Sequence, residues 1–303
     1  MAIRDRLTDG SVALTQSDLK VARTLLADYP AAGLNTVAQL AAVAGVSGPT
    51  VVRFVARLGF DGFSEFQKTL LTEVQERMSS PLAMINAGKG AVPQERVYQE
   101  VIFAAIKMLE STATMVPAAD FDAAVDLISD PSARLHFIGG RFSGYLAGML
   151  WSHMRHLRPD CHRITGAMSD QVDSLVDIGR RDVIVAFDYR RYQMDTIRIV
   201  NAAANQGARV VLFTDPWASP IAARAKVILT APVEGPSPFD TMLPAMAQIE
   251  ALIAAVTARI APISRARIEQ IEALRRTSGI TEDPLDPATD MAPARAEKNR
   301  RKT

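Results

Sequence analysis

Three side chains in the first quarter of the chain have the chemistry to read DNA, because Thr50, Arg53 and Arg57 recur at intervals of three and four residues. On a helix this spacing gathers them on one flank, where hydroxyl and guanidinium groups reach base edges and phosphates. Ser47 favours a helix start just before them as an N-cap, and Pro49 is tolerated in the first turn. We therefore predict a DNA-binding surface made of Ser47, Pro49, Thr50, Arg53 and Arg57.

A second helix must hold that flank in place, and the preceding residues predict one. Thr36 and Gln39 have the spacing of a capping box, and apolar residues follow at helical intervals. Gly45 can end this helix by adopting the left-handed conformation, so two short helices meet at a tight turn. This is the pattern of a helix-turn-helix, which presents its second helix to the major groove of double-stranded DNA. A helical hairpin whose arginines are merely solvated has the same local pattern and stays as the alternative.

A glycine-rich turn further along the chain has the chemistry to hold an anion. The apolar run 135–138 is followed by Gly139, Gly140, Arg141 and Ser143, an order typical of a strand, a turn and a helix. Backbone amides and a hydroxyl at such a turn can approach an anion at the helix N-terminus. Arg141 stands where a dinucleotide-binding fingerprint needs its second glycine, so we predict no cofactor. A tight connection without a ligand is the alternative.

Charged residues follow the next predicted strand, at 182–187. Parallel sheets bind ligands at the carboxyl ends of their strands, and adjacent guanidiniums there can bind a phosphate or carboxylate bidentately. Asp188 could instead neutralise one arginine in a structural pair, and that alternative stays open. The predicted effector-binding residues are Gly139, Gly140, Arg141, Ser143, Asp188, Arg190, Arg191 and Thr196.

Histidine and acidic residues elsewhere do not complete a recognised metal or catalytic motif. His153 and His156 lie one helical turn apart and Cys161 and His162 follow, but no second cysteine pair or carboxylate completes a zinc spacing. Glu234 or His162 is the residue type that an isomerase uses as a base, yet neither sits in a diagnostic motif. We predict neither a metal site nor a catalytic residue.

The pattern of apolar residues divides the chain into two domains that must position these groups. Residues 1–78 are predicted to be an all-helical DNA-binding domain, and the breaker-rich residues 79–94 a linker. Residues 95–280 alternate strand-like runs with helix-length stretches, which predicts an α/β domain with a parallel sheet flanked by helices. Its expected elements are strands at 134–138, 182–187, 208–213 and 226–229 and a helical pair at 241–259 and 262–276. Residues 281–303 are predicted to be a disordered, basic tail.

Composition limits the classes of function. The 303 residues include 34 Lys and Arg against 33 Asp and Glu, so nucleic-acid binding must come from a local surface. No apolar run has the roughly 18 to 20 residues that span a bilayer, and no secretory apolar segment follows the N-terminus, so we expect no membrane partner and a cytoplasmic protein. The single Cys161 excludes an intrachain disulfide and agrees with a reducing compartment.

Two parts of the chain resemble known families. Val-Ser-Gly-Pro-Thr-Val-Val-Arg-Phe at 46–54 and Leu-Gly-Phe-Asp-Gly-Phe at 58–63 resemble the amino-terminal domain of the RpiR/MurR family of bacterial transcription regulators. Phe-Ile-Gly-Gly-Arg-Phe-Ser-Gly at 137–144, Asp-Val-Ile-Val-Ala-Phe-Asp at 182–188 and the segment 214–229 resemble a SIS (sugar isomerase) domain, the usual carboxy-terminal partner in that family. The resemblance implies a helix-turn-helix regulator with a SIS-like sensor domain.

The same resemblance implies two Ser/Thr-rich loops that hold a sugar phosphate. Ser143 matches the first loop. The second loop departs from the family pattern, because the residues from Asp188 to Thr196 stand where Ser-x-Ser-Gly-x-Thr is usual. The departure puts a standard sugar phosphate pose in doubt and favours a small anion held by arginines.

A ligand-controlled transcription regulator is therefore the predicted function, with an operator in double-stranded DNA and a small anionic effector, of the sugar phosphate or sugar acid type, as partners. The DNA-binding domain carries eight basic and eight acidic residues, so one copy should bind DNA weakly. We expect a homodimer or homotetramer that reads a repeated site, assembled through helices such as 97–109 and 241–259. A sugar phosphate isomerase and an oligomerisation scaffold that senses nothing are the alternatives.

Overall fold

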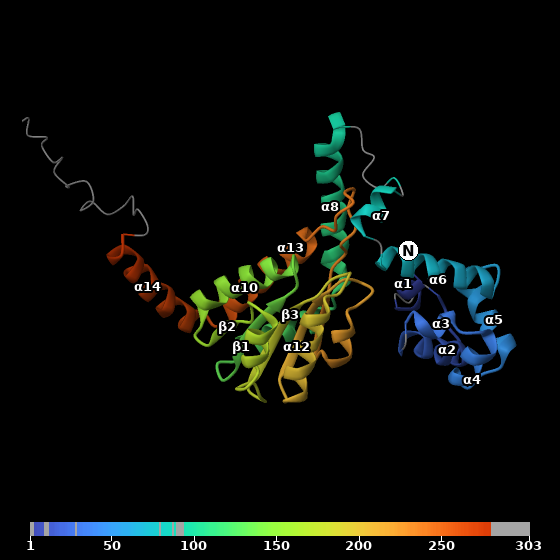
Figure 1. Cartoon of the computed structure of the whole chain (residues 1–303), viewed down its shortest axis with the longest axis horizontal. Coiled ribbons are helices and arrows are strands. Elements are labelled where there is room, and N and C mark those ends of the chain that lie inside the picture. The colour runs from blue at the N-terminus through green and yellow to red at the C-terminus, as the bar shows by residue number, and fades with distance from the viewer. Residues whose placement is uncertain are drawn as a thin grey trace, which may run out of the picture.

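The computed structural model describes residues 3–8, 12–27, 29–78, 80–86, 88 and 94–279, and the predicted tail at 281–303 lies outside them. The first module is helical throughout its described part and packs around one apolar core (Figure 1). Its elements are α1 (Ile3–Thr8), α2 (Gln16–Ala27), α3 (Ala31–Leu34), α4 (Val37–Ala44), α5 (Gly48–Arg57) and α6 (Phe63–Met78). Leu25, Leu40, Val51, Phe54 and Phe66, from four of these helices, are fully buried in that core. The core fixes the angle at which α5 is presented.

The predicted pair of helices with its tight turn is confirmed in detail. Thr36 caps α4 through a complete capping box, in which its hydroxyl accepts the amide of Gln39 and the Gln39 side chain returns to the amide of Thr36. Gly45 ends α4 at φ 62° and ψ 43°, a left-handed conformation that costs glycine no Cβ clash. Ser47 is the N-cap of α5 by its extended backbone, but its side chain caps no amide.

The segment predicted as a linker at 79–94 contains a short helix, α7 (Pro81–Asn86). Met84 of α7 is only 6% exposed, so this helix packs against other parts of the protein. After η1 (Gln94–Arg96), the long helix α8 (Val97–Met115) extends well beyond the body of the α/β domain (Figure 1). The residues around α7 show no regular spacing of apolar side chains, so the sequence did not predict this helix.

The α/β domain is built on a five-stranded parallel sheet in the order β2-β1-β3-β4-β5. Its strands are β1 (Arg134–Gly139), β2 (Cys161–Arg163), β3 (Asp182–Phe187), β4 (Arg209–Thr214) and β5 (Val227–Thr230). Each of the predicted strands is confirmed to within a residue or two. The edge strand β2 was not predicted, because three partly exposed residues carry no readable pattern.

Helices cover both faces of the sheet, as parallel strands require (Figure 1). Phe137 and Val185 point into the core under α9 (Ala118–Ser129), α10 (Ser143–Leu157) and α13 (Leu243–Arg259). Ile138 and Ile184, their neighbours along the strands, point into the opposite core under α12 (Met194–Asn205) and η2 (Pro220–Arg224). The short helix α11 (Met168–Asp173) lies beside α12 and has no buried residue. A final helix, α14 (Ala261–Thr277), packs on α10. The expected fold class, a helical module followed by an α/β domain, is confirmed.

None of the described helices is by itself long and apolar enough to cross a bilayer. Three bent helix pairs reach the required length and composition only when both members are counted together.

Candidate functional site

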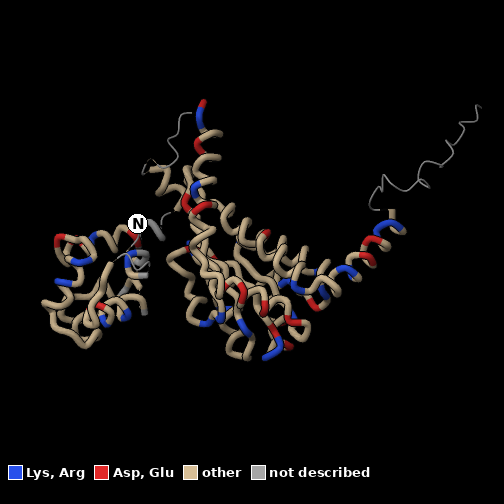
Figure 2. The backbone as a smooth tube through the Cα atoms, turned by 180° about the vertical axis from the view of Figure 1, so that it is seen from behind, with Lys and Arg blue, Asp and Glu red and all other residues tan. Residues whose placement is uncertain are grey.

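The first candidate surface lies on α5, where the predicted polar residues form one connected group. The hydroxyls of Ser47 and Thr50 are 2.8 Å apart, and Nη2 of Arg53 lies 3.4 Å from the Thr50 hydroxyl. Arg53 is exposed, while Val51 and Phe54, on the side of α5 that packs on the core, are fully buried. Pro49 occupies the first turn and is exposed as well. Lys and Arg are interspersed with Asp and Glu over the described part of the module, so this flank has no broad basic field around it (Figure 2).

Arg57, in contrast, is not free as the sequence analysis expected. Its Nη1 forms an ion pair with Asp18 of α2, whose carboxylate is buried. The other partners of Asp18 are the amide and the hydroxyl of Thr15, at 2.8 and 2.6 Å. A buried carboxylate needs a cation, so Arg57 is held toward the core of the module and helps to fix α5 on α2.

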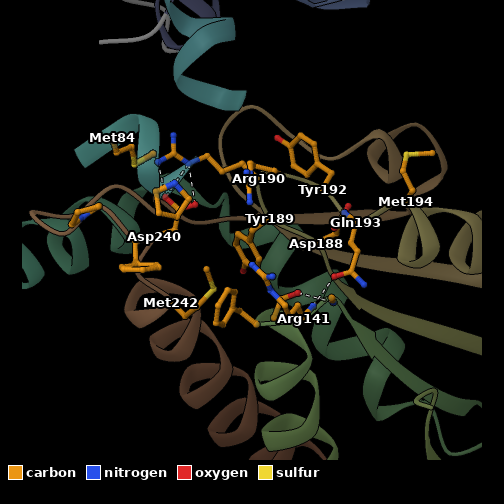
Figure 3. A pocket seen from close by; sticks show the side chains of 17 residues that line it. Met84, Arg141, Asp188, Tyr189, Arg190, Tyr192, Gln193, Met194, Asp240 and Met242 are labelled. Carbon is orange, nitrogen blue, oxygen red and sulfur yellow. Dashed lines mark hydrogen bonds and ion pairs between the residues drawn. The ribbon is translucent and has the colours of Figure 1, made fainter. Parts of the chain in front are cut away.

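The second candidate site is a cavity of about 590 Å³ at the carboxyl ends of β1 and β3 (Figure 3). Of the predicted effector-binding residues, it is lined by Gly140, Arg141, Ser143, Asp188, Arg190 and Arg191. Its further lining residues are Pro81, Met84, Phe142, Tyr189, Tyr192, Gln193, Met194, Pro238, Phe239, Asp240 and Met242. The structure therefore brings the two predicted loops to one cavity, as expected from the shared edge of a parallel sheet.

Gly139 and Thr196 do not line the cavity, contrary to the sequence-based expectation. A Cβ on Gly139 would lie 2.7 Å from backbone atoms of Ser143 and Gly144, so this glycine allows α10 to approach β1. Thr196 is buried inside the first turn of α12, among the core residues of that helix. Both residues shape the backbone next to the cavity.

The glycine turn is tied to β3 through Ser143. The Ser143 hydroxyl donates to the carbonyl of Phe187 at 2.7 Å and accepts the amide of Gly140 at 2.8 Å. Its hydrogen is therefore already used within the protein. The amides of Phe142 and Ser143, at the start of α10, have no hydrogen-bond acceptor among the described residues, as is usual for the first turn of a helix. These amides can receive an anion.

Gln193 joins the two loops that form the cavity. Its Oε1 accepts the amide of Arg141 at 2.7 Å, and its Nε2 donates to Asp195 at 2.9 Å. A Cβ on Gly140 would come within 2.8 Å of the same Oε1, so a larger residue at this position would displace the Gln193 side chain. The hydrogen bond to Gln193 uses only the backbone amide of Arg141. The Arg141 guanidinium lies over the Phe142 ring, 4.8 Å from the ring centroid.

Arg190 belongs to a structural ion pair, but its partner differs from the one considered in the sequence analysis. Its Nε and Nη2 bind Asp240 at 3.0 and 2.6 Å, its Nη1 lies 3.6 Å from Glu234, and its guanidinium stacks on Trp217. Asp188 makes no ion pair with it. The cation most deeply placed in the cavity is thus already neutralised by carboxylates from the loop before α13.

Asp188 is a buried carboxyl group that accepts the Ser219 hydroxyl and the amide of Gln193. Burial is the main reason why the pKa of Asp188 rises from 3.8 to about 6, and the nearby Asp215 and Asp195 carboxylates add to it. The two hydrogen bonds lower that pKa and offset part of the burial effect.

Because this pKa is raised on folding, the associated stability is present below pH 4 and is lost as the pH rises through about 6. Asp188→Asn removes the titration, so we expect the melting temperature of the variant to rise relative to wild type, by a few degrees, as the pH goes from 4.5 to 7.5. Thermal denaturation of both proteins at several pH values measures this difference. A constant difference across the range would contradict the assignment.

Two cations at the cavity remain uncompensated. Arg191 is exposed at the rim, and within the described part of the chain neither Arg191 nor Arg141 takes part in an ion pair. The glycine turn contributes Arg141, and the loop after β3 contributes Arg191. The chemistry of this arrangement is the binding of a negatively charged group between Arg141, Arg191 and the first turn of α10.

The residues considered for catalysis and metal binding take no part in this arrangement, although Glu234 lies 3.6 Å from Arg190 in the cavity wall. Glu234 and His162 do not line the cavity, and the ring of His162 stacks on that of His136 instead. His156 lies 2.8 Å from Arg275. Among the described residues no three His, Cys, Asp or Glu side chains gather to hold a metal ion.

Sequence reasoning missed the residues that come from distant segments. Met84 comes from the segment before α8, and Asp240 and Met242 come from the loop before α13. No local signal marks them, because the fold alone brings them to the end of β3. Tyr189 and Gln193 stand inside the predicted second loop, and their polar side chains next to Arg190 were the available signal.

Two family models match separate parts of the chain. The family model described as a helix-turn-helix domain of the rpiR family matches residues 1–77, and the SIS domain model matches residues 127–255. HTH-type transcriptional regulator HexR of Pseudomonas aeruginosa is 26% identical, over 78% of this chain and 80% of its own length. An uncharacterized HTH-type transcriptional regulator of Clostridium perfringens is 22% identical, over 73% of this chain and 78% of its own length. The bifunctional protein glk of Burkholderia thailandensis is 27% identical, but only 35% of its length is matched.

Solved structures show the same fold at low sequence identity. The sugar isomerase domain of an RpiR transcription factor from Sphaerobacter thermophilus has a TM-score of 0.56 and 22% identity, and the match covers 59% of this chain and 99% of that domain. The NanR protein of Vibrio vulnificus, solved with ManNAc-6P, has a TM-score of 0.54 and 16% identity, and the match covers 93% of this chain and all of that one.

Proposed function

The chain belongs to the RpiR family of helix-turn-helix regulators with a SIS domain, and we propose that a small anion in the cavity controls its binding to an operator in double-stranded DNA. The proposed effector is a sugar phosphate or a sugar acid. We propose that the protein acts as a regulator and not as an isomerase, and that it works in the cytoplasm.

The observation that carries the effector proposal is the pair of uncompensated guanidiniums of Arg141 and Arg191. Both arginines line a cavity at the ligand end of a parallel sheet, beside the unused amides of α10. The deeper Arg190 is engaged by Asp240, so we assign it to the wall of the cavity. NanR, which resembles this chain along almost its whole length, was solved with a sugar phosphate, which supports the same class of ligand here.

A thermal-shift screen of the full chain tests the effector proposal. The panel contains glucose 6-phosphate, N-acetylmannosamine 6-phosphate, gluconate and succinate. A ligand present at 100 times its dissociation constant stabilises the protein by about 2.7 kcal/mol, which is a shift of several degrees. Arg141→Ala and Arg191→Ala should remove the shift. Binding that survives both substitutions would place the anion elsewhere.

Arg53→Ala is expected to weaken operator binding by about 1 to 3 kcal/mol, because it removes a side chain already positioned on the exposed flank of α5 by Thr50. Arg53→Lys is the matched control, since it keeps the charge for phosphates but cannot contact a base bidentately. A gel-shift titration at fixed salt compares the three proteins. Equal affinity of Arg53→Ala and wild type would remove Arg53 from the DNA-binding surface.

We further propose a homodimer or homotetramer. The described part of α8 exposes a row of apolar side chains, with Tyr98 79% and Phe103 61% exposed. An exposed apolar stripe of this kind is typical of an interface between subunits. Light scattering at micromolar concentration should give at least twice the mass of the 32.8 kDa chain. A mass of one chain, with and without DNA, would contradict this proposal.

A further inference from the structure

The hydroxyl of Tyr189 is an exception in the hydrogen bonding of the cavity. Tyr189 lines the cavity, the residue is only 5% exposed, and its hydroxyl is buried without a hydrogen-bond partner. Figure 3 shows Tyr189 amid the labelled lining residues, between Arg190 and Arg141 in that view. A buried hydroxyl without a partner destabilises a protein. The Tyr189 hydroxyl oxygen has almost no accessible surface, so a ligand atom reaches it only when neighbouring side chains of the cavity wall shift on binding.

The neighbouring polar side chains of the cavity are already engaged within the protein. Ser143 bonds to Phe187 and Gly140, and both carboxylate oxygens of Asp188 accept hydrogen bonds. Gln193 bonds through its oxygen and its nitrogen, and the hydroxyl of Tyr192 donates to Asp215 at 2.8 Å. Tyr189 therefore differs from every one of these side chains.

We propose that the Tyr189 hydroxyl recognises the neutral part of the effector, by donating a hydrogen bond to an oxygen next to the anionic group. The inference rests on the proposed function, because Arg141 and Arg191 must hold the charge first. The effector is then an anion whose uncharged part carries an oxygen acceptor, such as the ring, hydroxyl or carbonyl oxygen of a sugar derivative. Tyr189 would distinguish this class from a bare anion.

The environment of Tyr189 suits a neutral donor. Burial raises the pKa of the Tyr189 hydroxyl well above its usual range, so the proton stays on the oxygen at physiological pH. The ring packs in the core that lies under α10 and α13, which fixes the position of the hydroxyl before a ligand arrives. A rigid donor loses little conformational freedom on binding.

Tyr189→Phe tests the inference, because it removes only the hydroxyl oxygen. Calorimetry with glucose 6-phosphate, N-acetylmannosamine 6-phosphate, gluconate and succinate identifies which of them bind wild type. Among the probes whose uncharged part carries an oxygen, the one that binds wild type most tightly should bind Tyr189→Phe about tenfold more weakly. This is the loss expected for one hydrogen bond to a desolvated group. The melting temperature of the ligand-free variant should equal or exceed that of wild type. Tyr192→Phe is the matched control and should melt at a lower temperature, because its hydroxyl has a protein partner.

The outcomes separate this inference from the proposed function. If wild type binds none of the four probes, the proposed function fails and this inference fails with it. If wild type binds and Arg191→Ala does not, but Tyr189→Phe binds within twofold of wild type, only the role of Tyr189 is overturned. A clear loss of melting temperature in ligand-free Tyr189→Phe would also overturn it, because the hydroxyl would then serve the fold.

Discussion

Arg190→Ala should lower the free energy of unfolding by about 3 kcal/mol or more, because it leaves Asp240 without the cation that neutralises it. The Arg190 side chain is 2% exposed, and its guanidinium also stacks on Trp217. Asp240 is 20% exposed and recovers part of its hydration, which places the effect at the lower end of the range for buried pairs. Urea denaturation at pH 7 measures the change.

Arg191→Ala is the matched control, because the neighbouring arginine is exposed and forms no ion pair within the described residues. We expect its stability to stay close to that of wild type, while its affinity for the effector falls. Arg190→Ala with unchanged stability and lost effector binding would reverse the two roles. It would make Arg190 the anion-binding residue and Arg191 a bystander.

Phe54→Ala should destabilise the helical module by about 3 to 5 kcal/mol, the usual cost of deleting a buried aromatic side chain. Phe54 is fully buried where α5 packs on the module core, next to the face that carries Thr50 and Arg53. A module of this size buries a modest core, so such a loss leaves much of it unfolded at 37 °C and removes DNA binding.

Val52→Ala is the control for Phe54, since Val52 lies on the same helix and is 44% exposed. It should change the stability by less than about 0.5 kcal/mol. Circular dichroism during thermal denaturation follows the helical module and the α/β domain together. If Phe54→Ala melted like Val52→Ala and kept its DNA affinity, the packing described for α5 would be wrong.

The local parts of this structure were predictable because their causes are local. The capping box at Thr36, the left-handed Gly45 and the fully buried strand β3 each follow from residues within a few positions of one another. The glycine turn before α10 was predictable for the same reason. These features fix the helix-turn-helix and the edge of the sheet where the cavity lies.

The pairing of charges could not be predicted, because it joins residues far apart in the sequence. Arg57 pairs with Asp18 across 39 positions, and Arg190 pairs with Asp240 across 50. Neither distance has a periodicity that a sequence pattern would reveal. Each pairing changes the expected role of one arginine, because Arg57 had been assigned to DNA and Arg190 to the effector. Both candidate sites therefore contain fewer unpaired cations than the sequence predicted.

The coupling of the cavity to DNA binding is the central claim, and fluorescence anisotropy tests it most directly. A labelled duplex, selected from a random-sequence pool by the protein itself, is titrated with wild type in the presence and absence of the tightest-binding anion of the four-probe panel. We predict a change in DNA affinity of at least about fivefold, as expected for a coupling free energy of 1 kcal/mol or more, and no change with Arg191→Ala at the same anion concentration. DNA affinity that stays the same in wild type while calorimetry shows the anion bound would contradict the account.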